Sequence, residues 1–124
     1  MSYTKKNLRD VEDVAAARGI EGFQARFPAG DLDCERTGLG LQTLGPGGRS
    51  PFKHSHEEAE EVYVVLSGSG TISLDGEEVE LGPLDAVRVA PTVERWFAAG
   101  DDGMEVLVFG ARHQGDGTIT PFDD

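Results

Sequence analysis

Glycine occupies 17 of the 124 positions of this chain, and the glycines are scattered along it without a regular repeat. Glycine adopts backbone conformations that other residues avoid, so it gathers at tight turns. A helical bundle has few such turns, and collagen would place a glycine at every third position. The glycine content therefore predicts an all-β fold whose short strands are joined by tight turns.

Apolar and polar residues alternate through the central part of the chain, and turn residues interrupt the alternation every few positions. A period of two is typical of strands with one buried face. The pattern predicts strands at 23–27, 39–44, 52–56, 61–67, 70–74, 77–81, 85–90, 94–98 and 104–110. Asp75 and Gly76 give a strong signal for a two-residue hairpin. Strands this short and closely spaced indicate a sandwich or a small barrel.

The two ends of the chain differ from this central pattern. Apolar residues recur at helical spacing over residues 8–18, with Asn7 as a candidate N-cap and Gly19 as a candidate stop. Residues 111–124 include few apolar side chains. We expect this tail to pack loosely and its His113 to lie on the surface.

Neither a linker nor an internal repeat divides the sequence, so residues 1–124 are predicted to form one domain with a barrel core at about 23–110. The net charge is −12, because 23 acidic residues outnumber 11 basic ones. So negative a surface repels nucleic-acid phosphates and anionic membranes. The start MSYTKKN lacks the apolar core of a signal peptide, and Cys34 has no partner for an intrachain disulfide. These features predict a cytoplasmic protein that binds neither nucleic acid nor membrane.

Three side chains that commonly bind metals lie close together in the sequence. His54 and His56 are two positions apart, so on a strand both imidazoles leave the same face. Glu61 stands where an acidic run meets an apolar strand, and across a turn at 57–60 it can face both histidines. Two imidazoles and one carboxylate hold iron(II) in non-haem sites that keep coordination positions open. The same donors suit manganese, nickel or zinc.

This segment resembles the first motif of the cupin superfamily. The residues at the marked positions of that motif are Gly48, His54, His56, Glu61 and Gly68. The resemblance covers about residues 38–110 and implies a double-stranded β-helix, or jelly-roll barrel, with a short N-terminal helix outside it. It also implies a divalent metal on His54, His56 and Glu61. Because cupins commonly pair through strand edges, it implies a homodimer as well.

The second cupin motif is degenerate in this chain. Its Pro, Gly, His and Asn positions hold Ala90, Thr92, Arg95 and Ala99. Arg95 thus stands where a typical cupin has its fourth metal ligand, and a guanidinium has no lone pair to give to a metal. An inward-facing Arg95 would instead pair with Glu61 or bind the carboxylate or phosphate of a ligand with two hydrogen bonds.

Three more side chains are candidates for the wall of a pocket. Tyr63 shares the strand face of Glu61, and Gln42 interrupts an otherwise apolar strand. Trp96 and Phe97 alternate between faces, so one of the two is expected to line the pocket, and we place Trp96 there.

Two function hypotheses remain open. In the first, His54, His56 and Glu61 hold a divalent ion that activates a small molecule for oxygenation or isomerisation. In the second, a metal-free module binds an anionic or polyhydroxylated ligand through Arg95. The resemblance to cupins does not choose between an enzyme and a binding module, because one fold carries many functions.

Overall fold

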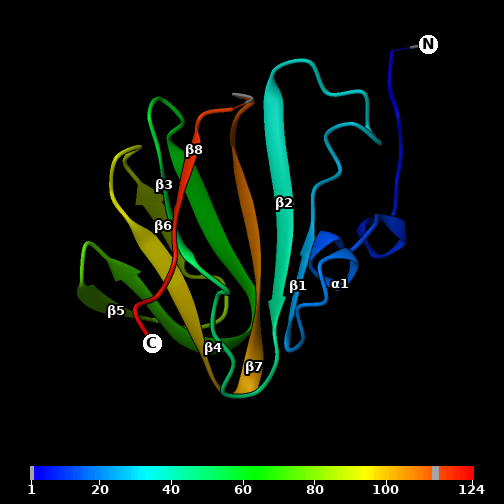
Figure 1. Ribbon diagram of the computed structural model, residues 1–124. Helices are drawn as coiled ribbons and strands as arrows, with labels where there is room; N and C mark the ends of the chain where they lie inside the picture. The colour runs from blue at the N-terminus through cyan, green and yellow to red at the C-terminus, as the bar shows by residue number, and fades with distance from the viewer. Residues whose placement is uncertain (1, 113–114) are drawn as a thin grey trace.

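The computed structural model describes residues 2–112 and 115–124 and confirms an all-β jelly-roll barrel (Figure 1). Its strands are β1 (Phe23–Arg26), β2 (Thr37–Leu44), β3 (Lys53–His56), β4 (Glu61–Leu74), β5 (Glu77–Leu81), β6 (Ala86–Val89), β7 (Arg95–Ala111) and β8 (Gly117–Thr120). The strand order is β1-β2-β7-β3-β8, and β4 pairs with β5, β6 and β7. The predicted hairpin between β4 and β5 is present, with positive φ at Asp75 and Gly76.

The long strands β4 and β7 hold the barrel together. They run antiparallel from the pair Glu61–Gly110 to the pair Leu74–Arg95, with register shifts on either side of Gly68. The sequence predicted two shorter strands in place of each, which is wrong. Each strand instead bends and continues, because a glycine with positive φ (Gly68 in β4, Gly103 in β7) absorbs the bend.

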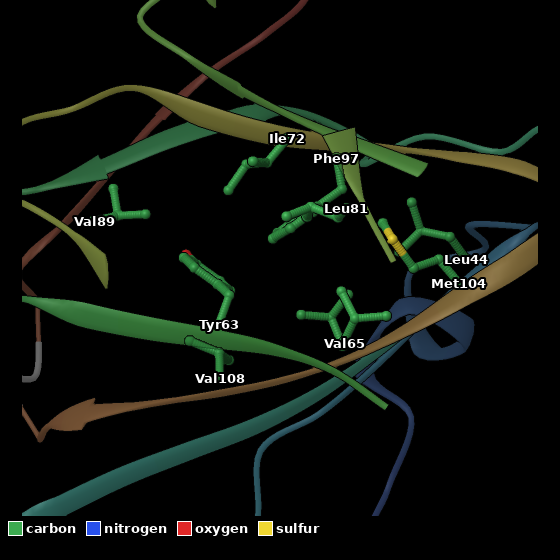
Figure 2. Close-up of a cluster of buried hydrophobic side chains, with 10 residues drawn as sticks. Leu44, Tyr63, Val65, Ile72, Leu81, Val89, Phe97, Met104 and Val108 are labelled. Atoms are coloured by element: carbon green, nitrogen blue, oxygen red, sulfur yellow. The ribbon is translucent and has the colours of Figure 1, made fainter. Parts of the chain in front are cut away.

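The hydrophobic core lies inside the barrel, and most of its side chains come from β4 and β7. Its buried side chains are Leu44, Tyr63, Val65, Ile72, Leu81, Val89, Phe97, Met104, Val106 and Val108. Figure 2 shows them converging from facing strands, with Tyr63 among the aliphatic side chains. Full burial of one such side chain stabilises the fold by about 1.5–3 kcal/mol. The core thus fixes the position of Tyr63, and with it the β4 backbone beside Glu61.

The N-terminal segment is less helical than predicted. A 3-10 helix, η1 (Leu8–Asp10), and a short helix, α1 (Val14–Ala17), replace the single helix expected over 8–18. Asp13 separates them, because its side chain accepts hydrogen bonds from Ala15 N and from Ala25 N of β1. This ties α1 to the barrel edge (Figure 1). Within residues 2–112 and 115–124, no helix is long and apolar enough to cross a membrane.

We predicted that the C-terminal segment packs loosely, but part of it forms a strand of the barrel. Residues 117–120 form β8, which pairs with all of β3. Beyond β8, the ring of Phe122 lies 5.1 Å from that of Trp96 and 3.8 Å from the guanidinium carbon of Arg49. His113 falls outside the described residues.

Gly68 offers a test of the bend in β4. Its φ is +75°, and a Cβ there would overlap the carbonyl oxygen of Gly103. Gly76 has a φ of +88° but nothing within 4 Å of its Cβ position. Gly76→Ala should therefore cost only the strain of a left-handed conformation, about 1–2 kcal/mol. Gly68→Ala should lower the free energy of unfolding by a further ~1–3 kcal/mol, because backbone atoms must move.

Urea unfolding of the two variants measures this difference. Equal losses of stability at the two positions would contradict the close approach of β4 and β7.

An ion pair between Arg9 and Glu105 offers a test of how the N-terminal segment is held. The guanidinium donates to both carboxylate oxygens, at 2.6 and 2.7 Å. The hydrogen bonds from Arg9 hold the pKa of Glu105 below its usual range. A lowered folded pKa means that the stabilisation is present above the unfolded value, about 4.3, and is lost as the pH falls through the folded value. Arg9→Ala should thus lower the melting temperature more at pH 7 than at pH 3.

Lys5→Ala is the matched control, because Lys5 is an exposed cation of the same segment with no ion pair in the described part of the chain. It should leave the melting temperature unchanged at both pH values. A loss from Arg9→Ala that is the same at pH 7 and pH 3 would contradict the ion pair.

Candidate metal centre

Two histidines project from β3 toward the same side of the strand. The rings of His54 and His56 lie 5.2 Å apart, almost perpendicular to each other. His54 pairs with Arg95 of β7 on one side of β3 and with Ile119 of β8 on the other. Strands on both sides therefore fix the backbone that carries both imidazoles.

The loop from β3 to β4 brings Glu61 opposite the histidines. Asp116, just before β8, accepts hydrogen bonds from the backbone N–H groups of Glu57, Glu58 and Ala59 at 2.9–3.0 Å. Its Oδ2 also lies 3.4 Å from Nδ1 of His56. One carboxylate from the tail thus holds the loop and lies against a histidine of the site.

The carboxylate of Glu61 is the centre of the site. Its Oε1 accepts a hydrogen bond of 2.6 Å from the Tyr63 hydroxyl. The same oxygen lies 3.2 Å from His56 Nε2 and 3.7 Å from His54 Nε2. Burial raises the pKa of Glu61, but the contacts with His54, His56 and Tyr63 outweigh it and hold this pKa well below its usual range. The carboxylate is therefore ionised at neutral pH.

Tyr63 stays protonated beside this charge. Burial raises the pKa of its hydroxyl well above the usual value, and the negative charge of Glu61 raises it further. The hydroxyl oxygen lies 3.5 Å from His54 Nε2 as well. Tyr63 thus acts as a neutral donor that orients Glu61.

Arg95 lies behind Glu61. Its side chain is fully buried, and its Nη2 is 3.5 Å from Glu61 Oε1. Its Nη1 donates to the carbonyl oxygens of Pro91 and Val93 at 3.2 and 2.9 Å. The sequence left the direction of Arg95 open, and the structure places it inward beside Glu61, which is one of the two partners considered for an inward-facing Arg95.

A divalent ion fits the three candidate ligands. One ligand atom each from His54, His56 and Glu61 lies within 4.8 Å of the others. Adjacent ligands of one ion are about 3.0 Å apart when bonds of ~2.1 Å meet at a right angle, close to the 3.2 Å between His56 and Glu61. Both ring nitrogens of His56 are buried and lack a hydrogen bond of good geometry to any described residue. Buried polar atoms rarely lack partners, so this orphaned imidazole suits a metal ion.

A cavity of about 350 Å³ opens beside the three residues. Tyr63 and Gln42 line it, as predicted, together with His54, His56 and Glu61. The rest of the wall is mostly apolar and includes side chains of β1, α1 and β8.

Two residues predicted to bind a ligand lie elsewhere. Alternation along β7 turns Arg95 and Phe97 into the barrel, so Trp96 faces the other way, where it packs on Phe122. Arg95 is enclosed behind Glu61 and is absent from the wall of the cavity. Neither side chain is placed to touch a molecule in the cavity.

Asp116 and Ile119 were not among the site residues predicted from the sequence. Ile119 lines the cavity, and Asp116 lies against His56. A signal for Ile119 was present in the segment Gly117–Thr120, whose β-branched residues are typical of a strand, whereas no local pattern indicated the role of Asp116.

Residues 40–110 match the family described as the cupin domain. The chain belongs to this family. A β-D-galactosidase from Mycobacterium tuberculosis is 43% identical over 79 residues, which cover 64% of this chain and 66% of that protein. The chain thus spans just under two thirds of the length of this curated relative.

Solved structures of cupins superpose on the whole barrel. A cupin protein from Bacteroides fragilis has a TM-score of 0.74 and 27% identity, over 93% of this chain and 88% of that one. A polyketide cyclase from Streptomyces resistomycificus has a TM-score of 0.74 and 22% identity, over 98% of this chain and 87% of that one. At this identity the second likeness concerns the fold alone.

The contact between Arg95 and Glu61 can be tested by a double-mutant cycle. Arg95→Met removes the buried cation and leaves the charge of Glu61 uncompensated, which should cost about 3–5 kcal/mol of stability. Adding Glu61→Gln to this variant should restore part of the loss, because the uncompensated charge is gone. Urea unfolding in the presence of a chelator measures both values.

Arg88 is the matched control. Its guanidinium lies 3.1 Å from the carboxylate of Glu60, but the side chains of this pair are 63% and 59% exposed. Arg88→Met should cost less than about 1 kcal/mol. Losses of similar size at the two arginines would show that Glu61 does not depend on Arg95.

Proposed function

We propose that this cupin is a metal-dependent enzyme in which His54, His56 and Glu61 hold a divalent transition metal next to the cavity. The observation that carries the proposal is the buried imidazole of His56, which lacks a well-formed hydrogen bond although it lies 3.2 Å from a carboxylate oxygen. Bound metal would complete its coordination and offset the ionised carboxylate. Three protein ligands leave positions open for a small molecule.

Each residue around the ion has a separate task. When bound, the ion supplies Lewis-acid chemistry by polarising an oxygen atom of the bound molecule. Tyr63 orients the carboxylate of Glu61 through its 2.6 Å hydrogen bond. Asp116 lies 3.4 Å from Nδ1 of His56, where it favours the tautomer that leaves Nε2 free for the metal. The apolar wall of the cavity excludes water from the reacting groups.

The remaining predictions from the sequence belong to the same proposal. Iron, manganese, nickel and zinc all suit these ligands, and oxygenation and isomerisation are the two reaction types proposed. We also propose that residues 1–124 form one cupin domain and that the protein is a cytoplasmic homodimer.

A metal-free module that binds a small molecule is the second candidate. The position of Arg95 favours this candidate. Its Nη2 lies 3.5 Å from Glu61 Oε1, so the guanidinium offsets the negative charge of Glu61 without a metal. Arg95 itself is enclosed, so the cation that this module would offer to an anionic ligand is Arg18, an exposed residue of the cavity wall.

Metal titration of protein purified without a histidine tag and treated with a chelator distinguishes the two candidates. An ion that binds only the folded state adds about 2.7 kcal/mol of stability at a hundredfold excess over its dissociation constant. We expect Mn²⁺, Fe²⁺, Ni²⁺ or Zn²⁺ to raise the melting temperature of the wild type. His56→Ala and Glu61→Ala should each abolish the rise.

Glu57→Gln is the matched control, because Glu57 is an exposed acidic residue of the same loop. It should keep the full rise in melting temperature. A rise that persists in His56→Ala and Glu61→Ala would place the ion on the acidic surface, and no rise with any of the four ions would favour the metal-free module.

A further inference from the structure

The walls of the cavity beside the metal centre are built mainly from aromatic and aliphatic side chains. The apolar residues of the wall include Ile20, Phe23, Phe27, Phe52, Val108 and Ile119. Phe27 and Ile119 are 52% and 55% exposed, so the apolar surface continues to the opening of the cavity. Position 40 is a glycine, and a Cβ there would come within 3.1 Å of the Phe27 ring. The missing side chain thus leaves room for Phe27 in this wall.

Most polar groups on the wall already have partners. The Tyr63 hydroxyl donates to Glu61, and Ser50 Oγ accepts a hydrogen bond from Phe97 N. His54, His56 and Glu61 are the candidate metal ligands. Few hydrogen-bonding groups therefore remain for a molecule that fills the cavity.

Arg18 is exposed to solvent, so Gln42 is the exception among the buried polar groups of the described wall. It is 9% exposed, and no hydrogen bond joins its side-chain amide to another residue in the described part of the chain. It lies on the inner face of the barrel, because it pairs with Val106, which in turn pairs with Val65, two residues from Tyr63. The amide is reachable from the cavity that Gln42 lines, so a ligand there can donate a hydrogen bond to its oxygen or accept one from its nitrogen.

We infer that the substrate is an aromatic molecule bearing a hydroxyl or carbonyl group, and that Gln42 recognises such a group inside the apolar cavity. This inference rests on the proposed function in one respect only, namely that one end of the substrate contacts a metal held by His54, His56 and Glu61. A sugar of similar size carries many hydroxyl groups, and each one buried against this wall without a partner would weaken binding. The wall thus selects against polyhydroxylated ligands, which the sequence analysis had left open.

Binding of 2-naphthol and naphthalene to the chelator-treated protein tests this inference without the metal. Ligand fluorescence gives both dissociation constants. Because the hydroxyl reaches Gln42, 2-naphthol should bind the wild type about five- to tenfold more tightly than naphthalene. Gln42→Leu should bring this ratio close to one. Galactose should not displace 2-naphthol even at a hundredfold excess over it.

Gln24→Leu is the matched control, because Gln24 is an exposed glutamine of the neighbouring strand β1. It should leave the ratio unchanged. If Gln42→Leu does not fold, Ile119→Ser tests the wall instead, since Ile119 is half-exposed on β8. That variant should weaken both ligands several-fold and equally.

Two results would overturn the inference: a ratio that Gln42→Leu leaves unchanged, or displacement of 2-naphthol by galactose at similar concentrations. Unchanged binding in Ile119→Ser would also overturn it. If metals stabilise the protein but 2-naphthol does not bind, this inference fails and the proposed function stands. If 2-naphthol binds as expected but no metal stabilises the protein, the proposed function fails alone.

Discussion

The ionised carboxylate of Glu61 inside the barrel is the constraint on which the rest of the site depends. An uncompensated charge in such a place costs several kcal/mol, so the surrounding residues must offset it. Its Oε1 meets a hydroxyl at 2.6 Å, two imidazoles at 3.2 and 3.7 Å and a guanidinium at 3.5 Å. These groups come from β3, β4 and β7, so compensation of one charge requires three strands in register.

Arg95 changes the charge balance of a cupin site and does more than remove a ligand. A histidine at this position would be a neutral donor, whereas the guanidinium is a permanent cation. The pair of Arg95 and Glu61 is neutral before any metal arrives, and a divalent ion must bind next to a positive charge. In the proposed metal site, the attraction for the ion would then come mainly from the lone pairs of His54 and His56, and affinity would depend more on these imidazoles than on the carboxylate of Glu61.

The sequence predicted those parts of the molecule that local patterns determine. The spacing of His54, His56 and Glu61 placed the three side chains together, and Asp75-Gly76 marked a hairpin. The sequence left open whether Arg95 faces inward, and only the structure shows that it is buried behind Glu61. The bends of β4 and β7 were predicted to be strand ends, because a glycine in the sequence can mark either a bend within a strand or the turn after it. Asp116 was missed because its role arises only when the tail returns to β3, a contact between distant segments that no local pattern records.

The candidate metal ligands and part of the cavity wall come from different regions of the chain. His54, His56 and Glu61 lie within the region 40–110 that matches the cupin family. Much of the apolar wall comes from outside that region, namely from β1, the segment around α1, and β8. The family match therefore includes the three candidate ligands and Gln42, whereas Phe23, Phe27 and Ile119 of the wall lie outside it. For this reason the size and chemistry of the cavity, rather than the activity of any relative, are the better guide to what the protein binds.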